Sequence, residues 1–341
     1  GFRVDLEKFS RVFLAGIGKG SASAVLALAK ILDRFLIRGI ALDVHVPHPE
    51  TRYENLQFFV GTHPLPSEVN LIATREIMKL AENLKEEDLL LVFIGGGGSS
   101  LACASEEEFR DSSVITKEFT KAGANIEELN VDRKHLSIFK GGGLVKLTSR
   151  ATIISLIVSD VCGNDLGTIA SGPTVFDSTT KAGAEEILKK YGLNPADFRL
   201  IETPKEKNLF ERTANLLFAC NEDAVAAMLA EAERLGFSSK IYSLALEGEA
   251  KDVFWSILQE IKSGQALLAA GESTVTIKTP FEATRGKGGR NAEAVLGAIC
   301  SFESGVKDGA VVMSFASDGH DNTEAAGAIA DAKTIETARS L

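Results

Sequence analysis

Residues 11–35 of this chain, RVFLAGIGKGSASAVLALAKILDRF, join an apolar run to a segment of helical period through a short glycine-rich turn. The run at 11–17 has the near-continuous hydrophobicity of a strand that is buried on both faces. From Ser21 to Phe35, leucine, isoleucine and alanine recur at three- and four-residue spacing, which predicts a helix with one face packed on a sheet. A buried strand that leads directly into such a helix is the repeating unit of α/β proteins.

The same alternation continues along the first part of the chain, where a second amphipathic helix is predicted at Ser67–Leu84. We therefore expect an α/β fold with a doubly wound parallel sheet that is covered by helices on both faces. Its predicted strands lie at about residues 11–17, 40–46, 56–60, 88–94 and 152–158.

A domain boundary is predicted near residues 200–212. A helix that ends at about Tyr191 is followed by Gly192, Pro195 and a charged stretch, and glycine and proline beyond a helix are stop signals. We divide the chain into residues 1–210 and a smaller α/β domain at 211–341 with mixed strand directions. In the second domain we predict strands at 216–219, 240–245, 266–270, 274–278 and 311–315, and helices at about 222–235, 249–263 and 289–300.

Composition excludes several classes of protein. The 341 residues are 45% hydrophobic and 25% charged, which rules out intrinsic disorder and collagen-like repeats. A formal net charge of -10 would repel a phosphate backbone, so general nucleic-acid binding is disfavoured. No run approaches the roughly 18 to 20 apolar residues that span a bilayer, so no membrane partner is expected.

Cysteine usage and the chain ends complete this picture. Cys103, Cys162, Cys220 and Cys300 form no CxxC pair, and four separate thiols fit a reducing compartment. We expect a soluble, cytoplasmic protein. Because the chain begins with glycine and stops within a predicted helix, we also expect further residues at both ends.

The turn at Gly16–Ser21 is a candidate phosphate site. Its glycines let the backbone approach an anion, the helix start offers free N–H groups, and Lys19 adds a positive charge. The spacing matches neither Walker A nor the GxGxxG fingerprint, and Asp43 lies inside an alternating run rather than where a ribose-binding acid is expected. A tight turn with a solvated lysine is the alternative.

Gly95–Gly98, after the predicted strand at 88–94, is the second candidate loop. Ordering consecutive glycines costs on the order of 1 kcal/mol or more per residue, so a mere connection would not favour them. A loop whose backbone N–H groups bind an oxyanion would favour consecutive glycines. A flexible hinge is the alternative.

Two further segments carry charged side chains. Arg133, Lys134 and Lys140 place three cations close together, which suits either an anionic ligand or a solvated helix face. Asp160 follows the strand predicted at 152–158 and could there accept a hydroxyl proton, hold a divalent metal or cap the next turn.

The second domain has anion-binding loops of its own. Gly286–Asn291 is a glycine loop that leads into a helix and carries Arg290, whose guanidinium can make bidentate hydrogen bonds to phosphate or carboxylate. Ser317–Asp321 follows the strand predicted at 311–315. Because both domains present such loops, a cleft between them is the expected site. His63 could reach this cleft from its Thr-His-Pro turn.

In order and spacing, these segments resemble the glycerate kinases of the second type, which carry a MOFRL C-terminal domain. The resemblance covers nearly the whole chain. Its most specific segments are THP at 62–64, GGGGSS at 95–100, RKHLS at 133–137 with KGG at 140–142, SDVCGNDLGTIASGP at 159–173, GES at 271–273 and GGRN at 288–291.

The resemblance implies two α/β domains around a deep cleft, the larger one Rossmann-like, and phosphorylation of glycerate from ATP with magnesium. By position, the catalytic residues are Lys19, Asp160 and Arg290. We assign binding of substrate or phosphate to Gly96, Gly97, Gly98, Ser99, Ser100, Arg133, Lys134, Ser171 and Gly172. We assign binding of the nucleotide to Gly18, Gly271, Glu272, Gly288, Gly289, Asn291 and Asp318. The metal ligands are left unassigned.

The expected reaction is in-line transfer of the γ-phosphoryl group of ATP to D-glycerate, at its 2-hydroxyl, a reaction that needs positioning and charge neutralisation. Lys19 and Arg290 would neutralise the transferring group. Asp160 would orient or deprotonate the hydroxyl, or hold magnesium, and the sequence does not choose between these roles. Arg133 and Lys134 are candidates for the glycerate carboxylate. Whether the chain forms a homodimer is left open.

Two other functions fit parts of the pattern. The strand, glycine turn and helix at the start also suit an NAD-dependent hydroxypyruvate reductase, although a well-placed ribose acid and a histidine for hydride transfer are missing. A non-catalytic sensor of a phosphorylated metabolite would use the same glycine nests.

Overall fold

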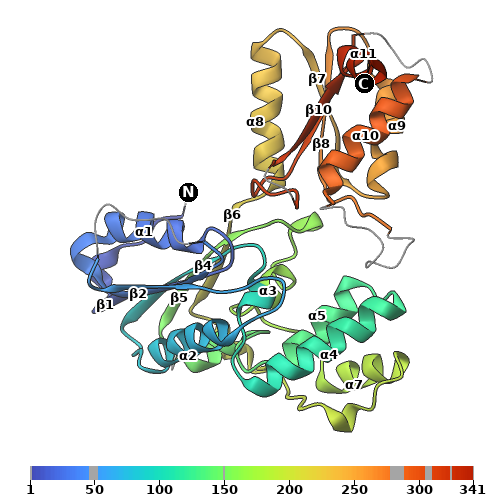
Figure 1. The fold of residues 1–341 in the computed structure, drawn as a ribbon. Helices are drawn as coiled ribbons and strands as arrows, with labels where there is room; N and C mark the ends of the chain where they lie inside the picture. The colour runs from blue at the N-terminus through green and yellow to red at the C-terminus, as the bar shows by residue number, and fades with distance from the viewer. Residues whose placement is uncertain are drawn as a thin grey trace. The chain divides into compact units, whose positions relative to one another are not determined.

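The computed structural model describes residues 2–45, 53–148, 150–276, 288–303, 309–322 and 325–340. The chain divides into two compact units, residues 1–220 and 221–341 (Figure 1). Each unit has its own sheets and its own hydrophobic core. None of the helices in the described ranges has the length and apolar character needed to cross a bilayer.

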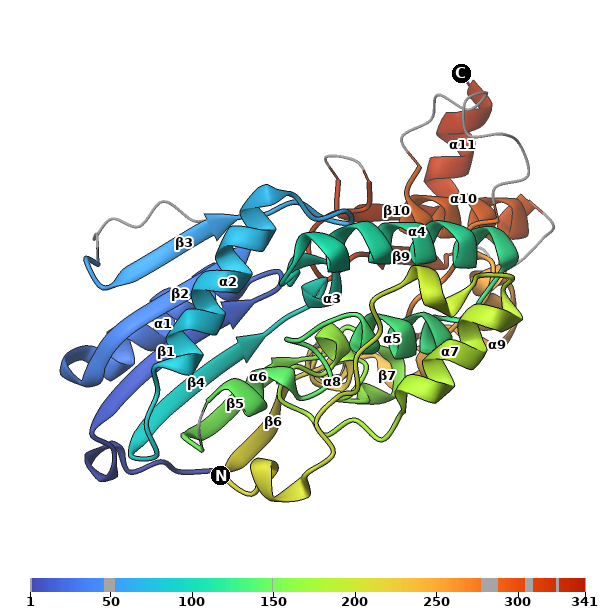
Figure 2. The same ribbon diagram turned by 90° about the horizontal axis from the view of Figure 1, so that it is seen from below.

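The first unit is built on a six-stranded sheet in which every neighbouring pair of strands is parallel. The strand order is β3-β2-β1-β4-β5-β6, the order of doubly wound dinucleotide-binding folds (Figure 2). The predicted doubly wound parallel sheet is therefore confirmed. The strands are β1 Arg11–Ile17, β2 Leu36–Asp43, β3 Leu56–Val60, β4 Asp88–Ile94, β5 Thr152–Val158 and β6 Thr213–Ala219.

Helices cover both faces of this sheet because successive strand residues point into two different cores. In β1, Val12 and Leu14 pack with α1 (Ser21–Leu32), whereas Phe13 and Ile17 pack with α2 (Glu68–Glu82). Figure 1 shows α1 and α2 on opposite sides of the sheet. Full burial of each such side chain contributes about 1.5–3 kcal/mol, so the two cores together fix the alternation of the strands.

The second strand differs from its predicted position at 40–46, because β2 spans Leu36–Asp43. Ile37 and Arg38 at its start are exposed, which interrupts the apolar run that marks the other strands. As a result Asp43 is the last residue of the strand, a placement that matters for the site. Residue 46 lies outside the described residues.

A separate group of helices fills the chain between β4 and β6. Phe119, Leu129 and Leu188 form a third core among the longer of these helices. The helices are α3 Gly98–Leu101, α4 Glu106–Ala122, α5 Ile126–His135, α6 Gly143–Leu147 and α7 Lys181–Lys190. β6, which follows the boundary predicted at residue 210, pairs with β5 and completes the sheet of this unit.

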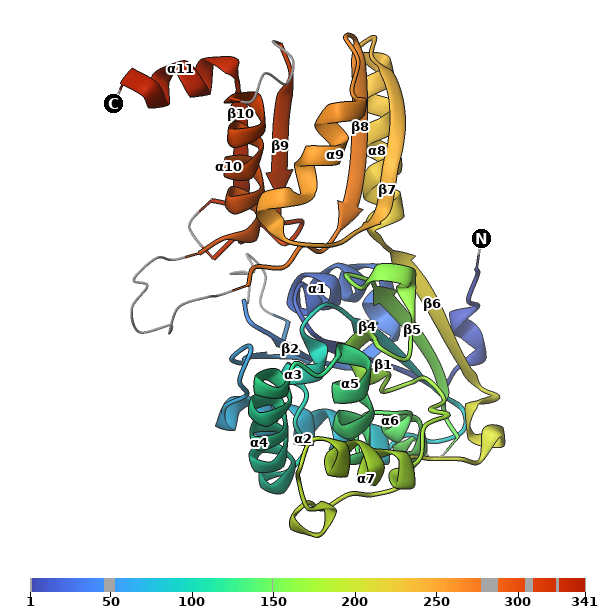
Figure 3. The same ribbon diagram turned by 90° about the vertical axis from the view of Figure 1, so that its right-hand side faces the viewer.

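The second unit contains a parallel pair, β7 and β8, and an antiparallel pair, β9 and β10. Figure 3 shows α8 along the first pair and α10 along the second, in agreement with their contacts. The elements are α8 Asn221–Arg234, β7 Ser238–Leu246, α9 Val253–Glu260, β8 Gln265–Gly271, α10 Arg290–Glu303, β9 Val311–Phe315, β10 Gly327–Asp331 and α11 Ala332–Ser340.

One predicted strand is wrong as far as the structure describes it. In the segment 274–278, Thr274 forms only an isolated bridge with Glu249, and residues 277 and 278 lie outside the described residues.

Candidate active site

The candidate site of the first unit lies where the strand order reverses. β1 and β4 are neighbours in the sheet, although β2 and β3 come between them in the sequence. At such a point the loops that follow the two strands diverge, and open α/β sheets bind ligands there. The loop after β1 carries Lys19, and the loop after β4 is Gly95–Gly98.

These two glycine loops contact each other through their backbones. Gly95 donates its N–H to Ile17 O at 2.8 Å, and Lys19 donates its N–H to Gly96 O at the same distance. Gly18 has a φ of +103°, and a Cβ on it would lie 2.3 Å from Gly95 O. Only glycine fits there, so the predicted loops form one backbone cradle with Lys19 half-buried within it.

Asp160 also lies against this cradle, in the loop that follows β5. A Cβ built on Gly96 would lie 2.1 Å from Asp160 Oδ2. The exposed carboxylate therefore lies directly against the middle of the Gly95–Gly98 loop. Lys19 and Asp160, predicted from separate motifs, are thus anchored on the same loop of β4.

His63 also lies against this loop. It follows β3, whereas Asp160 follows β5, and these strands lie on opposite sides of β4 in the sheet. A Cβ on Gly97, whose φ is +73°, would lie 2.9 Å from His63 Cδ2. The Thr62–Pro64 turn that follows β3 therefore borders the cradle through its imidazole, and His63 is exposed. The sequence named this histidine only as a further candidate, and its role in the site stays a prediction.

The short helix α3 packs on an unusual turn around Ser171. Ser99 Oγ lies 2.9 Å from Ser171 Oγ, and Ser100 is in the same helix. Ala170, Ser171 and Gly172 all have positive φ, of 51°, 56° and 58°. A left-handed conformation costs a non-glycine residue about 1–2 kcal/mol, so this turn needs outside support.

The support comes from the glycines that follow Lys140. Gly141 donates its N–H to Ser171 O at 2.9 Å, and Gly142 donates to Gly172 O at 2.8 Å. The sequence predicted Ser171 and Gly172 as binding residues but did not predict this pairing. Glycines in both segments, 141–142 and 171–172, indicated tight turns. Neither local sequence indicates that the first segment holds the second by backbone hydrogen bonds.

The three cations predicted to attract an anion have different surroundings. Lys134 Nζ lies 3.2 Å from Asp177 Oδ1, and Lys140 Nζ lies 2.8 Å from Glu108 Oε1. Lys140 and Glu108 are almost inaccessible to solvent, whereas Lys134 is partly exposed beside the buried Asp177. Lys140 is therefore a structural cation, and the binding role of Lys134 stays a prediction for a lysine that already has a carboxylate partner.

Arg133 is different, because among the described residues its guanidinium makes no hydrogen bond and no ion pair. It is half-buried on α5, and burial alone lowers its pKa. The adjacent Asp132 forms no ion pair with it. Burial, with Glu128 second, raises the pKa of Asp132 to about 7, and within the described residues its carboxylate oxygens have no hydrogen-bond partner. A desolvated cation without a counter-charge is a place where an anionic ligand would be stabilised.

Asp43 corrects the sequence interpretation of the ribose site. It ends β2, where a ribose-binding acid would be expected, rather than lying inside a strand. Its carboxylate is buried and accepts hydrogen bonds from Ala22 N at 2.9 Å and Val44 N at 2.7 Å. It is therefore committed to the backbone and not to a ribose hydroxyl.

In the second unit, Arg290 begins α10 and lies in a network with the Gly-Glu-Ser segment that follows β8. Its Nη1 is 2.5 Å from Glu272 Oε1 and 3.1 Å from Ser273 O. Gly271 ends β8 immediately before this pair. The Arg290 side chain is 46% exposed, and Glu272 fixes the orientation of its guanidinium.

The start of α10 is capped by Asp321. This buried carboxylate accepts hydrogen bonds from Asn291 N, Asn291 Nδ2 and Ala292 N at 2.9–3.0 Å. Gly289 packs on it, since a Cβ there would lie 2.6 Å from Asp321 O, and Gly288 precedes at a φ of +76°. Asp318 is exposed in the same loop. The predicted nucleotide-binding residues of this unit thus form two adjoining clusters.

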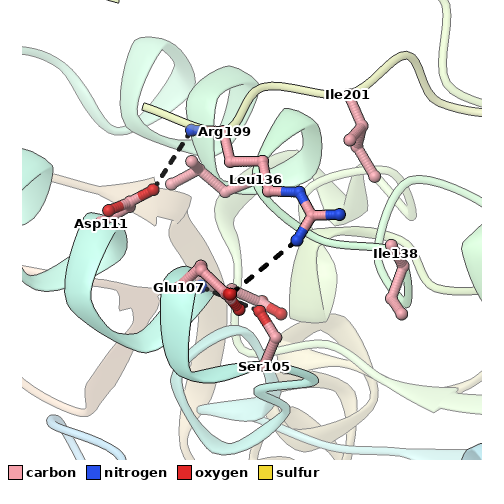
Figure 4. A pocket seen from close by; sticks show the side chains of 8 residues that line it. Ser105, Glu107, Asp111, Leu136, Ile138, Arg199 and Ile201 are labelled. Atoms are coloured by element: carbon pink, nitrogen blue, oxygen red, sulfur yellow. Dashed lines mark hydrogen bonds and ion pairs between the residues drawn. The ribbon is translucent and has the colours of Figure 1, made fainter. Parts of the chain in front are cut away.

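A cavity of about 120 Å³ lies elsewhere in the first unit (Figure 4). Arg199 extends into it above Glu107, whose Oε1 is 3.9 Å from Arg199 Nη1. No residue predicted for the site lines it. Its lining residues are Ser105, Glu107, Glu108, Asp111, Leu136, Ile138, Arg199 and Ile201.

With this geometry, the chain can be compared with known proteins. Residues 2–201 match the family described as "Domain of unknown function (DUF4147)", and residues 265–341 match the MOFRL family. A glycerate 2-kinase from Pyrococcus horikoshii is 35% identical over 98% of this chain and 79% of its own length. The chain belongs to the glycerate 2-kinase family.

Further relatives carry either a kinase name or a reductase name. The D-glycerate 2-kinase of Thermotoga maritima is 33% identical over 97% of this chain and 81% of its own length. The crystal structure of glycerate kinase from the same organism superposes with a TM-score of 0.83 at 30% identity, covering 98% of this chain and 82% of that one. A relative from Agrobacterium vitis, 33% identical over 94% of this chain and 75% of its own length, carries a provisional hydroxypyruvate reductase name.

Proposed function

We propose that this member of the glycerate 2-kinase family transfers the γ-phosphoryl group of ATP to the 2-hydroxyl of D-glycerate. The observation that carries the proposal is the cradle at the strand ends, in which the Lys19 loop and Asp160 both rest on Gly96. A cation and a carboxylate that are fixed on one glycine loop are the minimum set for neutralising a phosphoryl group and directing a hydroxyl.

In the proposed mechanism, Lys19 stabilises the charge on the transferring oxygens, and Asp160 orients the attacking hydroxyl and accepts its proton. Arg290 would supply a second cation from the other unit. That Arg290 and Lys19 converge in one cleft stays a prediction. The division of the chain between residues 210 and 211 also stays a prediction. The four cysteines lie far apart in the sequence and form no CxxC pair, which supports a reducing, cytoplasmic location.

Magnesium would accompany the ATP. The described residues contain no group of three or more histidine, cysteine, aspartate or glutamate side chains able to hold a metal on their own. In kinases, Mg²⁺ is usually bound by one or two carboxylates together with substrate phosphates and water, so the donor set fits an ion that arrives with the nucleotide. Mg²⁺ would there neutralise phosphate charge, and Asp160 is the carboxylate at hand if the protein contributes a ligand.

Arg133 is the residue that we propose for the carboxylate of glycerate. Among the described residues, it is the member of the three-cation segment whose guanidinium has no carboxylate partner, whereas Lys134 and Lys140 each have one. α5, which carries it, packs against the Ile169–Ser171 turn that lies on Ser99.

Replacing Arg133 with methionine should raise KM for glycerate about 10- to 100-fold, because a hydrogen bond to a charged group is worth about 1.5–3 kcal/mol. KM for ATP should change little. Arg110→Met is the matched control, since Arg110 is exposed on the neighbouring α4. Steady-state kinetics with each substrate varied in turn would measure this, and an unchanged KM for glycerate would remove Arg133 from the site.

The overall proposal is tested by incubating the purified protein with ATP, Mg²⁺ and D-glycerate. We expect ADP and 2-phosphoglycerate, which phosphorus NMR distinguishes from 3-phosphoglycerate. The absence of any phosphoglycerate would refute the kinase function. Oxidation of NADH by hydroxypyruvate would instead favour the reductase, although the commitment of Asp43 to backbone amides argues against a ribose site at β2.

A further inference from the structure

The loop that carries Lys19 is anchored on both sides by neighbouring strand ends. Toward β2, Gly18 donates its N–H to Leu42 O at 3.1 Å, and Ser21 Oγ donates to the same carbonyl at 2.9 Å. Toward β4, Lys19 donates its N–H to Gly96 O at 2.8 Å. The backbone of Lys19 is therefore held between two strands rather than left as an open turn.

Asp43 closes this arrangement at the start of α1. It is 2% exposed, and its Oδ2 accepts the hydrogen bond of Ala22 N at 2.9 Å. Its Oδ1 accepts from Val44 N at 2.7 Å and from His45 N at 3.3 Å. The first amides of a helix have no partners within the helix, and a negative charge there is stabilised by the helix dipole. One buried carboxylate thus joins the end of β2 to the first turn of α1.

We propose that Asp43 is a positioning residue, which holds the Lys19 loop in the geometry that phosphoryl transfer requires. This inference rests on the proposed kinase function. Asp43 contacts no reacting atom in this scheme, and it acts through Ala22 and the turn before it. Replacing Asp43 should lower the rate strongly although Asp43 does not touch the reacting atoms. A displacement of a catalytic group by 1 Å can cost about 100-fold in rate.

Asp43→Asn is the informative substitution because it keeps the size of the side chain. Both carboxylate oxygens accept hydrogen bonds from backbone N–H groups, whereas an asparagine has one oxygen and one NH₂ group. Whichever way the amide is turned, one backbone donor faces another donor. The turn before α1 would then move or loosen.

Asp88→Asn is the matched control. Asp88 is also a buried aspartate of the same sheet, and it accepts hydrogen bonds from Lys85 N at 2.7 Å and from Arg11. Asp88 begins β4, whereas Asp43 ends β2. Because the strands are parallel, Asp88 lies at their amino ends and Asp43 at their carboxyl ends. Both substitutions should lower the melting temperature, and only one of them touches the Lys19 loop.

The test compares kcat and KM of the full chain and both variants, below the melting temperature of each. We expect Asp43→Asn to lower kcat about 10- to 100-fold with KM for glycerate within threefold of wild type. We expect Asp88→Asn to keep kcat within twofold. A kcat for Asp43→Asn within twofold of wild type, or equal losses in the two variants, would overturn the proposal.

Hydrogen exchange of the backbone amides separates this inference from the kinase function, since it needs no turnover. In Asp43→Asn, the amides of residues 18–22 should exchange at least tenfold faster than in wild type and in Asp88→Asn. If the wild type phosphorylates no glycerate, the kinase function fails, and faster exchange still supports Asp43 as the anchor of the loop. Unchanged exchange at residues 18–22 overturns the positioning role whatever the activity.

Discussion

Lys19→Ala should lower kcat about 100- to 1,000-fold while the protein stays folded. Removing one preorganised electrostatic donor from a site typically costs about 2.7–4 kcal/mol of transition-state stabilisation, which corresponds to this factor. The fold should tolerate the change, because the backbone hydrogen bonds that hold the loop, such as that from Lys19 N to Gly96 O, do not depend on the identity of this side chain. Release of ADP in the presence of D-glycerate would measure kcat.

Lys30→Ala is the control for this substitution. Lys30 is exposed in the last turn of α1, the helix that follows the Lys19 loop. The substitution therefore removes an equal charge at the helix end far from the glycine cradle. Its kcat should stay within twofold of wild type. A Lys19→Ala enzyme with kcat within a few fold of wild type would show that the ammonium does not act on the phosphoryl group.

Asp160→Asn should lower kcat about 100- to 10,000-fold, the range that a general acid or base typically contributes. The isosteric amide keeps the packing on Gly96 but can neither accept the hydroxyl proton nor carry a charge. Measurements at increasing Mg²⁺ concentration separate two roles. A loss of kcat that excess Mg²⁺ does not restore is expected for the base, whereas recovery at high Mg²⁺ would show that Asp160 acts as a metal ligand.

Gly96→Ala tests the same carboxylate from the other side. The added Cβ would lie 2.1 Å from Asp160 Oδ2, so the carboxylate must move, while the backbone of residue 96 has an ordinary φ. We expect a substantial loss of kcat with little change in melting temperature. Gly183→Ala in α7 is the control, because its Cβ would lie an ordinary 3.5 Å from Thr180 Oγ1. Full activity of Gly96→Ala would contradict the proposed place of Asp160.

Local sequence patterns predicted much of the first unit. β1, β3, β4 and β5 have the predicted bounds. For β1, β4 and β5 the reason is that buried parallel strands are continuous apolar runs, whereas β3 is only partly buried. β2 was displaced because its exposed first residues do not show that signal. The strand predicted at 274–278 shows the opposite error in its described part, residues 274–276, because β-branched residues favour a strand but Thr274 forms only an isolated bridge.

For the site, the sequence by itself determined which residues stand at strand ends, because a strand, a glycine turn and a helix follow each other along the chain. It therefore named Lys19, Gly96 and Asp160. Only the tertiary structure decided that these loops rest on one another. It also decided that Lys134 and Lys140 have carboxylate partners, whereas Arg133 has none in the described part of the chain. The partners of the two lysines lie 43 and 32 positions away, and packing of separate helices and loops, not local pattern, brings such charges together.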